Sequence, residues 1–501
     1  MKKKSAPVDP SSLTLGGRLR FLARDSAVYG MAGAISRFAS LITFPIVVRH
    51  LTVSDYGVLD ILQVFGGFLT VFLIFGQDSG VARYFFEYED RETRRELISQ
   101  SFFLRLYVMA VTLPLVWLLG GQALRLLGID QAFRPAFDIL LLQAPFVVLL
   151  NFAVVLLRVT FSRNRYIVLS VGFSFTQAVC WLVAIFLFDA SVRGILLAGL
   201  LATVVFAGIG IHYIRGWLTP TLRLNHVLQM LPYALPYGAI SALRAIIPLM
   251  ERALVVFLLA ADALGLYAAG AKITMFYMIF AFAFQSAWEP FALSISKRPD
   301  ARTTYNLVLK VFVLLACILV LVLTSLARPM ITLLASEKYI EAAVIVFPLL
   351  MALALESISW ITEIGLILER RTGLKLVGYL LGTLASVLGI FLLAPGLGLA
   401  GVSIAVLLGS IVKTAAVTLL ARRVHNLQWE LANFIVILPA TFIGGAVIQR
   451  VATDHGAVAA LALCAAVVLV LVGLTYAVVL TPDQRGRIRE ALQRRGLLQV
   501  K

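Results

Sequence analysis

The sequence predicts an all-α polytopic membrane protein with fourteen transmembrane helices. Hydrophobic residues make up 61% of the 501 residues, charged residues make up 14%, and the mean hydropathy is +0.95. A water-soluble fold cannot keep so much apolar surface away from water. Apolar runs of about 20 residues recur along the chain, and each is long enough to cross a hydrocarbon core about 30 Å thick.

The predicted spans are mostly uniformly apolar and contain the internal glycine and proline that membrane helices tolerate. In chain order they cover residues 26–48, 56–77, 101–119, 136–157, 166–188, 194–214, 229–259, 264–294, 306–326, 341–367, 375–394, 397–421, 431–449 and 457–480.

The distribution of Lys and Arg predicts how these spans are oriented. If the N-terminus is cytoplasmic, 29 of the 43 Lys and Arg residues lie in cytoplasmic tails and loops, and seven lie on the opposite side. Every second loop obeys this positive-inside bias. We therefore expect both termini on the cytoplasmic side of a bacterial cytoplasmic (inner) membrane. Most of the net charge of +17 then reflects topology, and we expect no nucleic-acid partner.

Short loops and missing motifs predict that the protein is not an enzyme. The chain holds neither GxxxxGK[ST] nor HExxH, and no loop is large enough for a soluble catalytic domain. Cys180, Cys317 and Cys464 lie inside apolar runs without the spacing of metal ligands. We therefore expect no catalytic residue, no metal site and no cofactor apart from a coupling H⁺ or Na⁺ ion.

An internal repeat indicates two six-helix halves. At an offset of 208 residues, VVRHLTVSDYGVLDI (47–61) aligns with VVFLLAADALGLYAA (255–269), so that Gly57 corresponds to Gly265. Because the offset spans six predicted helices, the two copies have the same orientation, as in transporters that bind substrate between such halves. The predicted parts are a cytoplasmic basic tail (1–25), the first half (26–214), a cytoplasmic linker (215–228), the second half (229–421), two additional transmembrane helices (422–480) and a second cytoplasmic basic tail (481–501).

Two stretches resemble a known family. They are ISRFASLITFPIVVRHLTVSDYGVLDILQ (35–63) and LPYALPYGAISALRAIIPLMERALVVFLLAADALGLYAAGAKI (231–273). The second holds the pair Glu251-Arg252, with Glu in place of the more usual Asp. It also holds a run from Gly265 to Lys272 like the family's Gly-x-Tyr-x-x-Ala-x-Lys. The chain resembles the polysaccharide-transport branch, the lipid-linked oligosaccharide flippases, of the multidrug/oligosaccharidyl-lipid/polysaccharide exporter superfamily.

This resemblance implies a V-shaped pair of helical bundles that works by alternating access. It implies a cargo of undecaprenyl-diphosphate-linked oligosaccharide, moved outward for O-antigen, capsule or exopolysaccharide biosynthesis. Membrane lipids and other polysaccharide-assembly proteins are the expected partners. The alternatives are an ion-coupled multidrug exporter of the same fold and a non-enzymatic membrane subunit of a polysaccharide secretion complex. A glycan polymerase or ligase would need a large outer loop, which the short loops argue against.

Charged side chains inside predicted spans mark candidate functional residues, because charge is costly near the bilayer centre. Arg37 lies well inside the first span, and Arg244 is nearly its counterpart at the repeat offset. Guanidinium groups bind phosphate oxygens bidentately, and an ammonium group acts as a point charge. Arg37, Arg244, Arg252 and Lys272 are therefore the predicted substrate-binding residues for a diphosphate. The alternative is that each pairs with a buried acid and holds helices together.

Three other cations lie closer to the cytoplasmic ends of their spans. We expect the charged groups of Arg105 and Lys310 to reach water by snorkelling. Lys413 is two turns from its helix end, and snorkelling and a buried role both remain open for it.

Intramembrane acids are the second set of candidates. Asp60, Glu251, Glu356 and Glu363 either bind a coupling proton or Na⁺, or neutralise the cavity cations. Glu356 and Glu363 are seven residues apart and share one helix face. Glu356 is the preferred coupling residue because it lies deep and belongs to this pair.

Aromatic side chains around the seventh and eighth spans either stack on sugar rings or pack in the protein core. They are Tyr233, Tyr237, Tyr267, Phe276, Tyr277 and Trp288.

Overall fold

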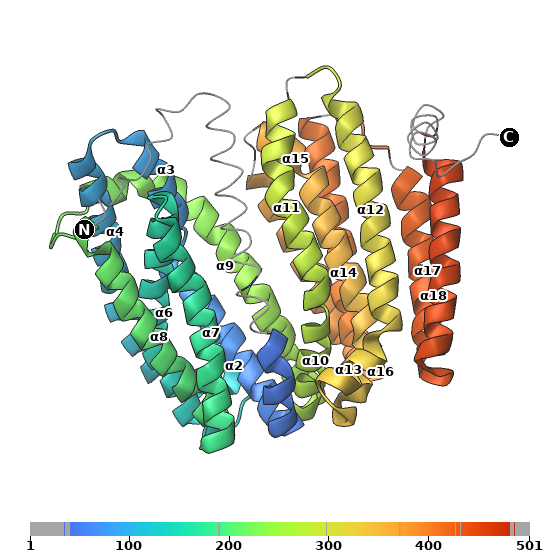
Figure 1. Ribbon diagram of the computed structural model, residues 1–501, viewed down its shortest axis with the longest axis horizontal. Helices are drawn as coiled ribbons and strands as arrows, with labels where there is room; N and C mark the ends of the chain where they lie inside the picture. Colours follow the sequence, from blue (N-terminus) through green and yellow to red (C-terminus); the bar gives the residue numbers. More distant parts are fainter. Residues whose placement is uncertain are drawn as a thin grey trace, which may run out of the picture. The chain divides into compact units, whose positions relative to one another are not determined.

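The computed structural model describes residue 35, residues 41–480 except 189, 190, 297, 370, 372, 426 and 431, and residue 485. These residues form helices and no strand (Figure 1), which confirms the predicted all-α fold. The predicted tail 1–25 and all of the tail 481–501 except Arg485 lie outside the described residues, as does Arg37.

The helices are joined by short connections and 3₁₀ turns. They are α2 (Val53–Ile74), α3 (Gln77–Glu87), α4 (Arg91–Leu118), α5 (Gly120–Leu126), α6 (Arg134–Val159), α7 (Arg163–Leu187), α8 (Val192–Ile214), α9 (Asn225–Leu259), α10 (Ala261–Ile273), α11 (Met275–Ile295), α12 (Ala301–Ser325), α13 (Ala327–Leu334), α14 (Ala343–Thr362), α15 (Ile364–Leu368), α16 (Gly373–Val424), α17 (Ala432–Asp454) and α18 (Gly456–Leu474).

Among the described residues, eleven helices are long and apolar enough to cross a membrane by length and composition. A shorter apolar helix, Leu41–His50, covers the end of the first predicted span. One of the eleven, α16, contains two predicted spans, 375–394 and 397–421, and Gly398 (φ 57°, ψ −137°) kinks the chain at the start of the second. Glycine adopts this backbone conformation without the clash that a Cβ atom would cause. The count of fourteen spans stays a prediction.

Helix α4 begins ten residues before the predicted span 101–119. Asp90 caps its N-terminus, because its carboxylate accepts a 2.7 Å hydrogen bond from the backbone N–H of Thr93. Hydrogen bonds from Thr93 lower the pKa of Asp90. The basic segment that starts at Arg91 therefore forms the first helical turns and not a loop. The cap determines where this helix starts, whereas hydropathy detects only its apolar part.

The backbone contacts divide the chain into two compact units, residues 1–268 and 269–501. In the first unit, α6 and α7 pack along α8, and α2 and α3 pack along α9. A core cluster in this unit includes Phe152, Leu156, Leu169 and Phe206, none more than 8% exposed. Because α9 packs along α2 and α3, the seventh predicted span belongs to the first unit. The predicted division into halves at 215–228 stays a prediction.

In the second unit, α14 is a central and deeply buried helix. It packs along α16, α12 and α17, and α17 packs along α18. The side chains of Leu350 and Ile358 on α14 are completely buried. The acids Glu356 and Glu363, at the C-terminal part of α14 and at its C-cap, are therefore held in the protein interior.

Helices α2 and α10 cross at a contact that two glycines make possible. A Cβ atom on Gly57 would lie 2.7 Å from the backbone nitrogen of Gly265, and a Cβ atom on Gly265 would overlap the carbonyl group of Val53. Any larger residue at either position would meet backbone, which cannot move aside as a side chain can. Gly57 and Gly265 are also counterparts in the predicted repeat.

We expect Gly265→Ala to destabilise the fold, because its methyl group would push α10 away from the Val53 carbonyl group. Overpacking of this kind costs about 1–3 kcal/mol. The measurement is the thermal-unfolding midpoint of the purified protein in detergent, followed by intrinsic fluorescence. Gly208→Ala is the control, because an added Cβ atom there meets nothing within 4 Å. Equal midpoints for the two variants would contradict the close contact.

Candidate functional site

Charged and polar side chains from α2, α9 and α10 meet inside the first unit, and we call them the α9 charge cluster (Asp60, Glu251, Arg252 and Tyr267). The Nε of Arg252 donates to Asp60 at 2.5 Å, and the two side chains are only 12% and 17% exposed. The hydroxyl of Tyr267 donates to Glu251 at 3.1 Å, and the Arg252 guanidinium lies 5.6 Å from the Tyr267 ring centre. Each charge in the cluster is thus partnered within the bundle.

The position of Arg252 on α9 explains how it reaches Asp60. Its Nη1 atom donates to the carbonyl oxygen of Pro248, one turn earlier in α9, at 3.2 Å. Pro236 and Pro248 lie inside α9. Because a proline has no backbone N–H group, the carbonyl groups of Pro232 and Arg244, four residues earlier, lose their usual helical partner. The Asp60–Arg252 ion pair joins α9 to α2, so Arg252 follows the alternative prediction, in which a cation pairs with a buried acid and holds helices together. Asp60, predicted to bind a coupling ion or neutralise a cation, neutralises Arg252.

The other predicted cations lie differently. Arg244 is exposed on α9 and Lys272 is half-buried near the end of α10. Arg37 lies outside the described residues, so the structure does not place it beside Arg244. The four predicted substrate-binding residues as a set remain a prediction.

The two acids of α14 both pair with lysines of α16 in the second unit. The carboxylate of Glu356 lies 3.1 Å from Nζ of Lys413, and that of Glu363 lies 2.9 Å from Nζ of Lys375. Lys413 also lies 5.0 Å from the ring centre of Tyr379. Glu356 is 24% exposed and Glu363 is 10% exposed. The acids therefore neutralise cations in this structure, and their role in ion coupling stays a prediction.

The expected snorkelling of Arg105 and Lys310 is wrong. The Arg105 side chain is fully buried, pairs with Asp78 at 2.6 Å and lies 4.5 Å from the ring centre of Phe152. Lys310 is 1% exposed and pairs with Glu430 at 2.5 Å. Distance from a helix end indicates depth but says nothing about neighbours, and in both cases an acid from another segment is within reach.

Three of the six aromatic residues predicted near the seventh and eighth spans are core residues, and Phe276 is half-buried. Tyr267, Tyr277 and Trp288 are at most 3% exposed, and the Tyr277 hydroxyl lies 2.6 Å from the hydroxyl of Ser357. Tyr237 is exposed, whereas Tyr233 is half-buried and has the Arg83 guanidinium 4.3 Å from its ring centre. Packing, the alternative to sugar stacking, fits the three buried side chains.

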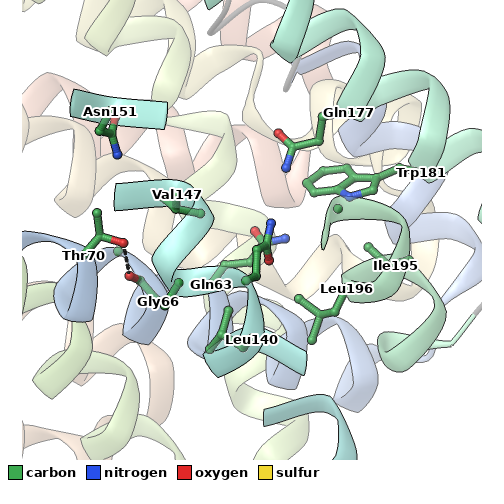
Figure 2. Close-up of a pocket in the computed structure, with 14 residues that line it drawn as sticks. Gln63, Gly66, Thr70, Leu140, Val147, Asn151, Gln177, Trp181, Ile195 and Leu196 are labelled. Atoms are coloured by element: carbon green, nitrogen blue, oxygen red, sulfur yellow. Dashed lines mark hydrogen bonds between the residues drawn. The ribbon is translucent and has the colours of Figure 1, made fainter. Parts of the chain in front are cut away.

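A polar pocket lies within the first unit, between α2, α6, α7 and α8, and the sequence analysis did not identify it (Figure 2). Its volume is about 380 Å³, and none of its lining residues is charged. Its polar side chains come from Gln63, Thr70, Gln143, Asn151, Gln177 and Trp181. We call it the amide pocket. The amide side chains of four of these residues lie inside predicted apolar spans. This pattern could have indicated the pocket, because a polar group buried in such a span needs a partner.

Comparison with known families gives one match. Residues 22–296, more than half of the chain, match the family model described as polysaccharide biosynthesis protein. No curated protein matches the sequence.

Comparison with solved structures shows a shared fold. The lipid II flippase MurJ, in an inward closed conformation, superposes with a TM-score of 0.72 at 15% identity and covers 90% of this chain and 99% of its own. An inward-facing multidrug resistance MATE transporter of the MOP superfamily gives 0.65 at 18% identity, over 77% and 94%. A MOP superfamily transporter from Pyrococcus furiosus gives 0.60 at 18%, over 83% and 96%. These matches confirm the predicted exporter fold.

Removing one member of the Asp60–Arg252 pair should be more damaging than removing both. Asp60→Asn or Arg252→Gln leaves one buried charge without its partner, which costs about 3–5 kcal/mol. We expect the double variant to recover most of this loss in thermal unfolding. The exposed pair Arg83–Glu87 is the matched control, because removing either charge there should change stability by less than about 1 kcal/mol. Strictly additive losses at Asp60 and Arg252 would show that the two charges do not interact.

Proposed function

This chain belongs to the polysaccharide biosynthesis protein family, and we propose that it is a flippase for an undecaprenyl-diphosphate-linked oligosaccharide. The cargo moves from the inner to the outer leaflet of the bacterial cytoplasmic membrane without chemical change, so the protein is not an enzyme. A coupling H⁺ or Na⁺ ion is the only cofactor in this proposal. Both termini lie in the cytoplasm, and other polysaccharide-assembly proteins are candidate partners.

The single observation that carries the proposal is the exposed guanidinium group of Arg244. Arg244 lies in the middle part of α9, a helix of 35 residues. It is 19 residues beyond Asn225, or about 28 Å along the axis at 1.5 Å per residue. A guanidinium exposed at this depth must face water or a polar ligand, because contact with lipid tails is costly. A diphosphate headgroup is the anion that its planar donor group matches best.

The fold supports a lipid-linked cargo. The fold is shared with a protein named as a lipid II flippase. The cargo proposed for this chain joins a lipid tail to a polar head. A bundle that moves such a molecule must offer polar side chains to the head while the tail stays in lipid. The exposed Arg244 on α9 and the amide pocket on α2, α6, α7 and α8 are polar features of this kind.

A multidrug exporter is the second candidate, because multidrug transporters also share this fold. Cationic drugs favour sites with carboxylates, since like charges repel. The amide pocket carries no carboxylate, and the exposed charge on α9 is positive. Both observations favour an anionic headgroup with an uncharged polar part over a cationic drug.

Arg244→Ala should abolish most glycan export. Losing a charge-assisted hydrogen bond to a phosphate costs about 1.5–3 kcal/mol, which corresponds to about tenfold or more in affinity. The measurement is surface glycan in a host strain that lacks its own flippase, at equal membrane levels of each variant. Arg37→Ala should have a similar effect, and Arg244→Lys should retain part of the activity. Arg298→Ala removes an exposed cation paired with Asp300 and serves as the control. Full export by both Arg37→Ala and Arg244→Ala would refute the cationic site.

Glu356→Gln should uncouple transport from an ion gradient. Glu356 is more exposed than Glu363, so an ion reaches its carboxylate more easily, and protonation or Na⁺ binding would compete with Lys413. In proteoliposomes with an imposed H⁺ or Na⁺ gradient, cargo movement by Glu356→Gln should not depend on the gradient. Glu363→Gln is the matched control and should keep the dependence. A Glu356→Gln variant with the full wild-type dependence would exclude Glu356 as the coupling residue.

A further inference from the structure

The amide pocket holds a point at which three polar groups converge. Gly199 of α8 lines the pocket, and the position of a Cβ atom on it marks this point. The indole Nε1 of Trp181 lies 3.3 Å from that position, and the amide nitrogens of Gln143 and Gln177 lie 3.5 Å and 3.7 Å from it. Because glycine has no side chain, these three groups face the part of the pocket in front of the Gly199 Cα atom.

Protein partners do not use all of these polar groups. The amide of Gln143 donates to the hydroxyl of Thr203 at 2.8 Å, and that hydroxyl donates to the carbonyl oxygen of Gly199 at 2.7 Å. The Trp181 Nε1 atom, by contrast, is buried and has no hydrogen-bond partner. A buried donor without a partner costs about 1–3 kcal/mol, so a ligand that accepts from it gains a favourable site.

More amide groups are available around the pocket. Figure 2 shows Gln177 and Trp181, both on α7, side by side on one side of the cavity, with Thr70 of α2 on the other. The Thr70 hydroxyl already donates to the carbonyl oxygen of Gly66 at 2.8 Å. Across the described residues, the amides of Gln63, Asn151 and Gln177 form no hydrogen bond with the protein. Each amide offers donors and an acceptor to a ligand.

The chemistry of the lining selects an uncharged, hydroxyl-rich ligand. Without a carboxylate in the lining, a cation has no counter-charge, and without Lys or Arg an anion has none. Hydroxyl groups both donate and accept, as amides do, and the face of the Trp181 indole packs against the C–H face of a saturated ring. A volume of about 380 Å³ is at the lower end of the usual range for ligand pockets. One or two pyranose rings match a pocket of this volume and carry both hydroxyl groups and C–H faces.

We propose that the amide pocket binds an uncharged sugar residue of the cargo glycan, with a ring oxygen or hydroxyl group in the part of the pocket in front of Gly199, close to Trp181, Gln143 and Gln177. This inference rests on the proposed function in taking the cargo to be a lipid-linked glycan. The diphosphate then provides attraction that is common to all such lipids, whereas the amide pocket selects the sugar. Trp181 and Gln177 are specificity-determining residues in this proposal.

The first experiment uses soluble sugars and the full-length protein in lipid nanodiscs. Glucose, galactose and N-acetylglucosamine are titrated separately, with glucuronic acid as the charged counterpart, and tryptophan fluorescence is recorded. At least one neutral sugar should give a saturable change that is absent from Trp181→Phe and weaker with glucuronic acid. Replacing NaCl by KCl should leave the Trp181 signal unchanged. No saturable change with any neutral sugar, or a response of Trp181 to Na⁺ alone, would overturn the proposal.

The second measurement is the affinity of glycine variants for the sugar that binds best. Gly199→Ala fills the point between the three polar groups without removing any of them, and we expect affinity to fall by about fivefold or more. Gly208→Ala, on the same helix with open space around its Cβ position, should bind like wild type. Gln177→Leu provides a second test if Gly199→Ala does not fold. Wild-type affinity in the folded variant tested would overturn the proposal.

A third titration separates this inference from the proposed function. A short-chain prenyl diphosphate, with and without a linked N-acetylglucosamine, is added to the same nanodiscs. If neither diphosphate binds while a free sugar does, the flippase proposal fails and the sugar pocket stands. If the bare diphosphate binds and neither the linked nor any free sugar adds affinity, the flippase proposal stands and the sugar pocket is wrong.

Discussion

The constraint on which this structure depends is the cost of charge inside an apolar bundle. A buried ion without a partner is far more costly than a paired one. Pairs between different helices meet this requirement in both units, and each pair fixes where two segments lie against each other. They are Asp60–Arg252, Asp78–Arg105, Glu356–Lys413 and Glu363–Lys375. The charges that mark these residues as functional candidates in the sequence therefore take part in ion pairs that hold the helices in register.

This constraint separates two kinds of polar residue. A charge that is buried and paired, such as Arg252 with Asp60, is explained by the fold alone. Arg244 is different because it is exposed partway along a long helix, and Trp181 is different because its buried N–H group has no protein partner. An exposed guanidinium group and a buried N–H group without a protein partner can each contact a substrate. A headgroup for the first and a sugar ring for the second would meet the same physical requirement from the side of the substrate.

Hydropathy predicted the all-α fold because each crossing of a membrane needs about 20 apolar residues, and such runs recur along the sequence. The seven-residue spacing of Glu356 and Glu363 predicted that both share one face of α14, and both reach lysines of α16. The position of Arg105 did not reveal Asp78, because that contact joins segments 27 residues apart through the packing of α3 on α4. The amide pocket was not predicted, because charged side chains alone marked polar candidates inside the spans. Gln143 and Gln177 are neutral, yet they are costly in an apolar span for the same reason.

The contact between Gly57 and Gly265 bears on the predicted repeat. Two copies of a repeat that are related by an axis place most residues far from their own counterparts, so a residue meets its counterpart only next to that axis. Gly57 and Gly265 are counterparts at the offset of 208, and their backbones approach until neither position has space for a side chain. At such a place the requirement for a small residue applies to both copies at once. The contact between α2 and α10 therefore fits two copies related by an axis that passes close to these glycines, and the repeat itself stays a prediction.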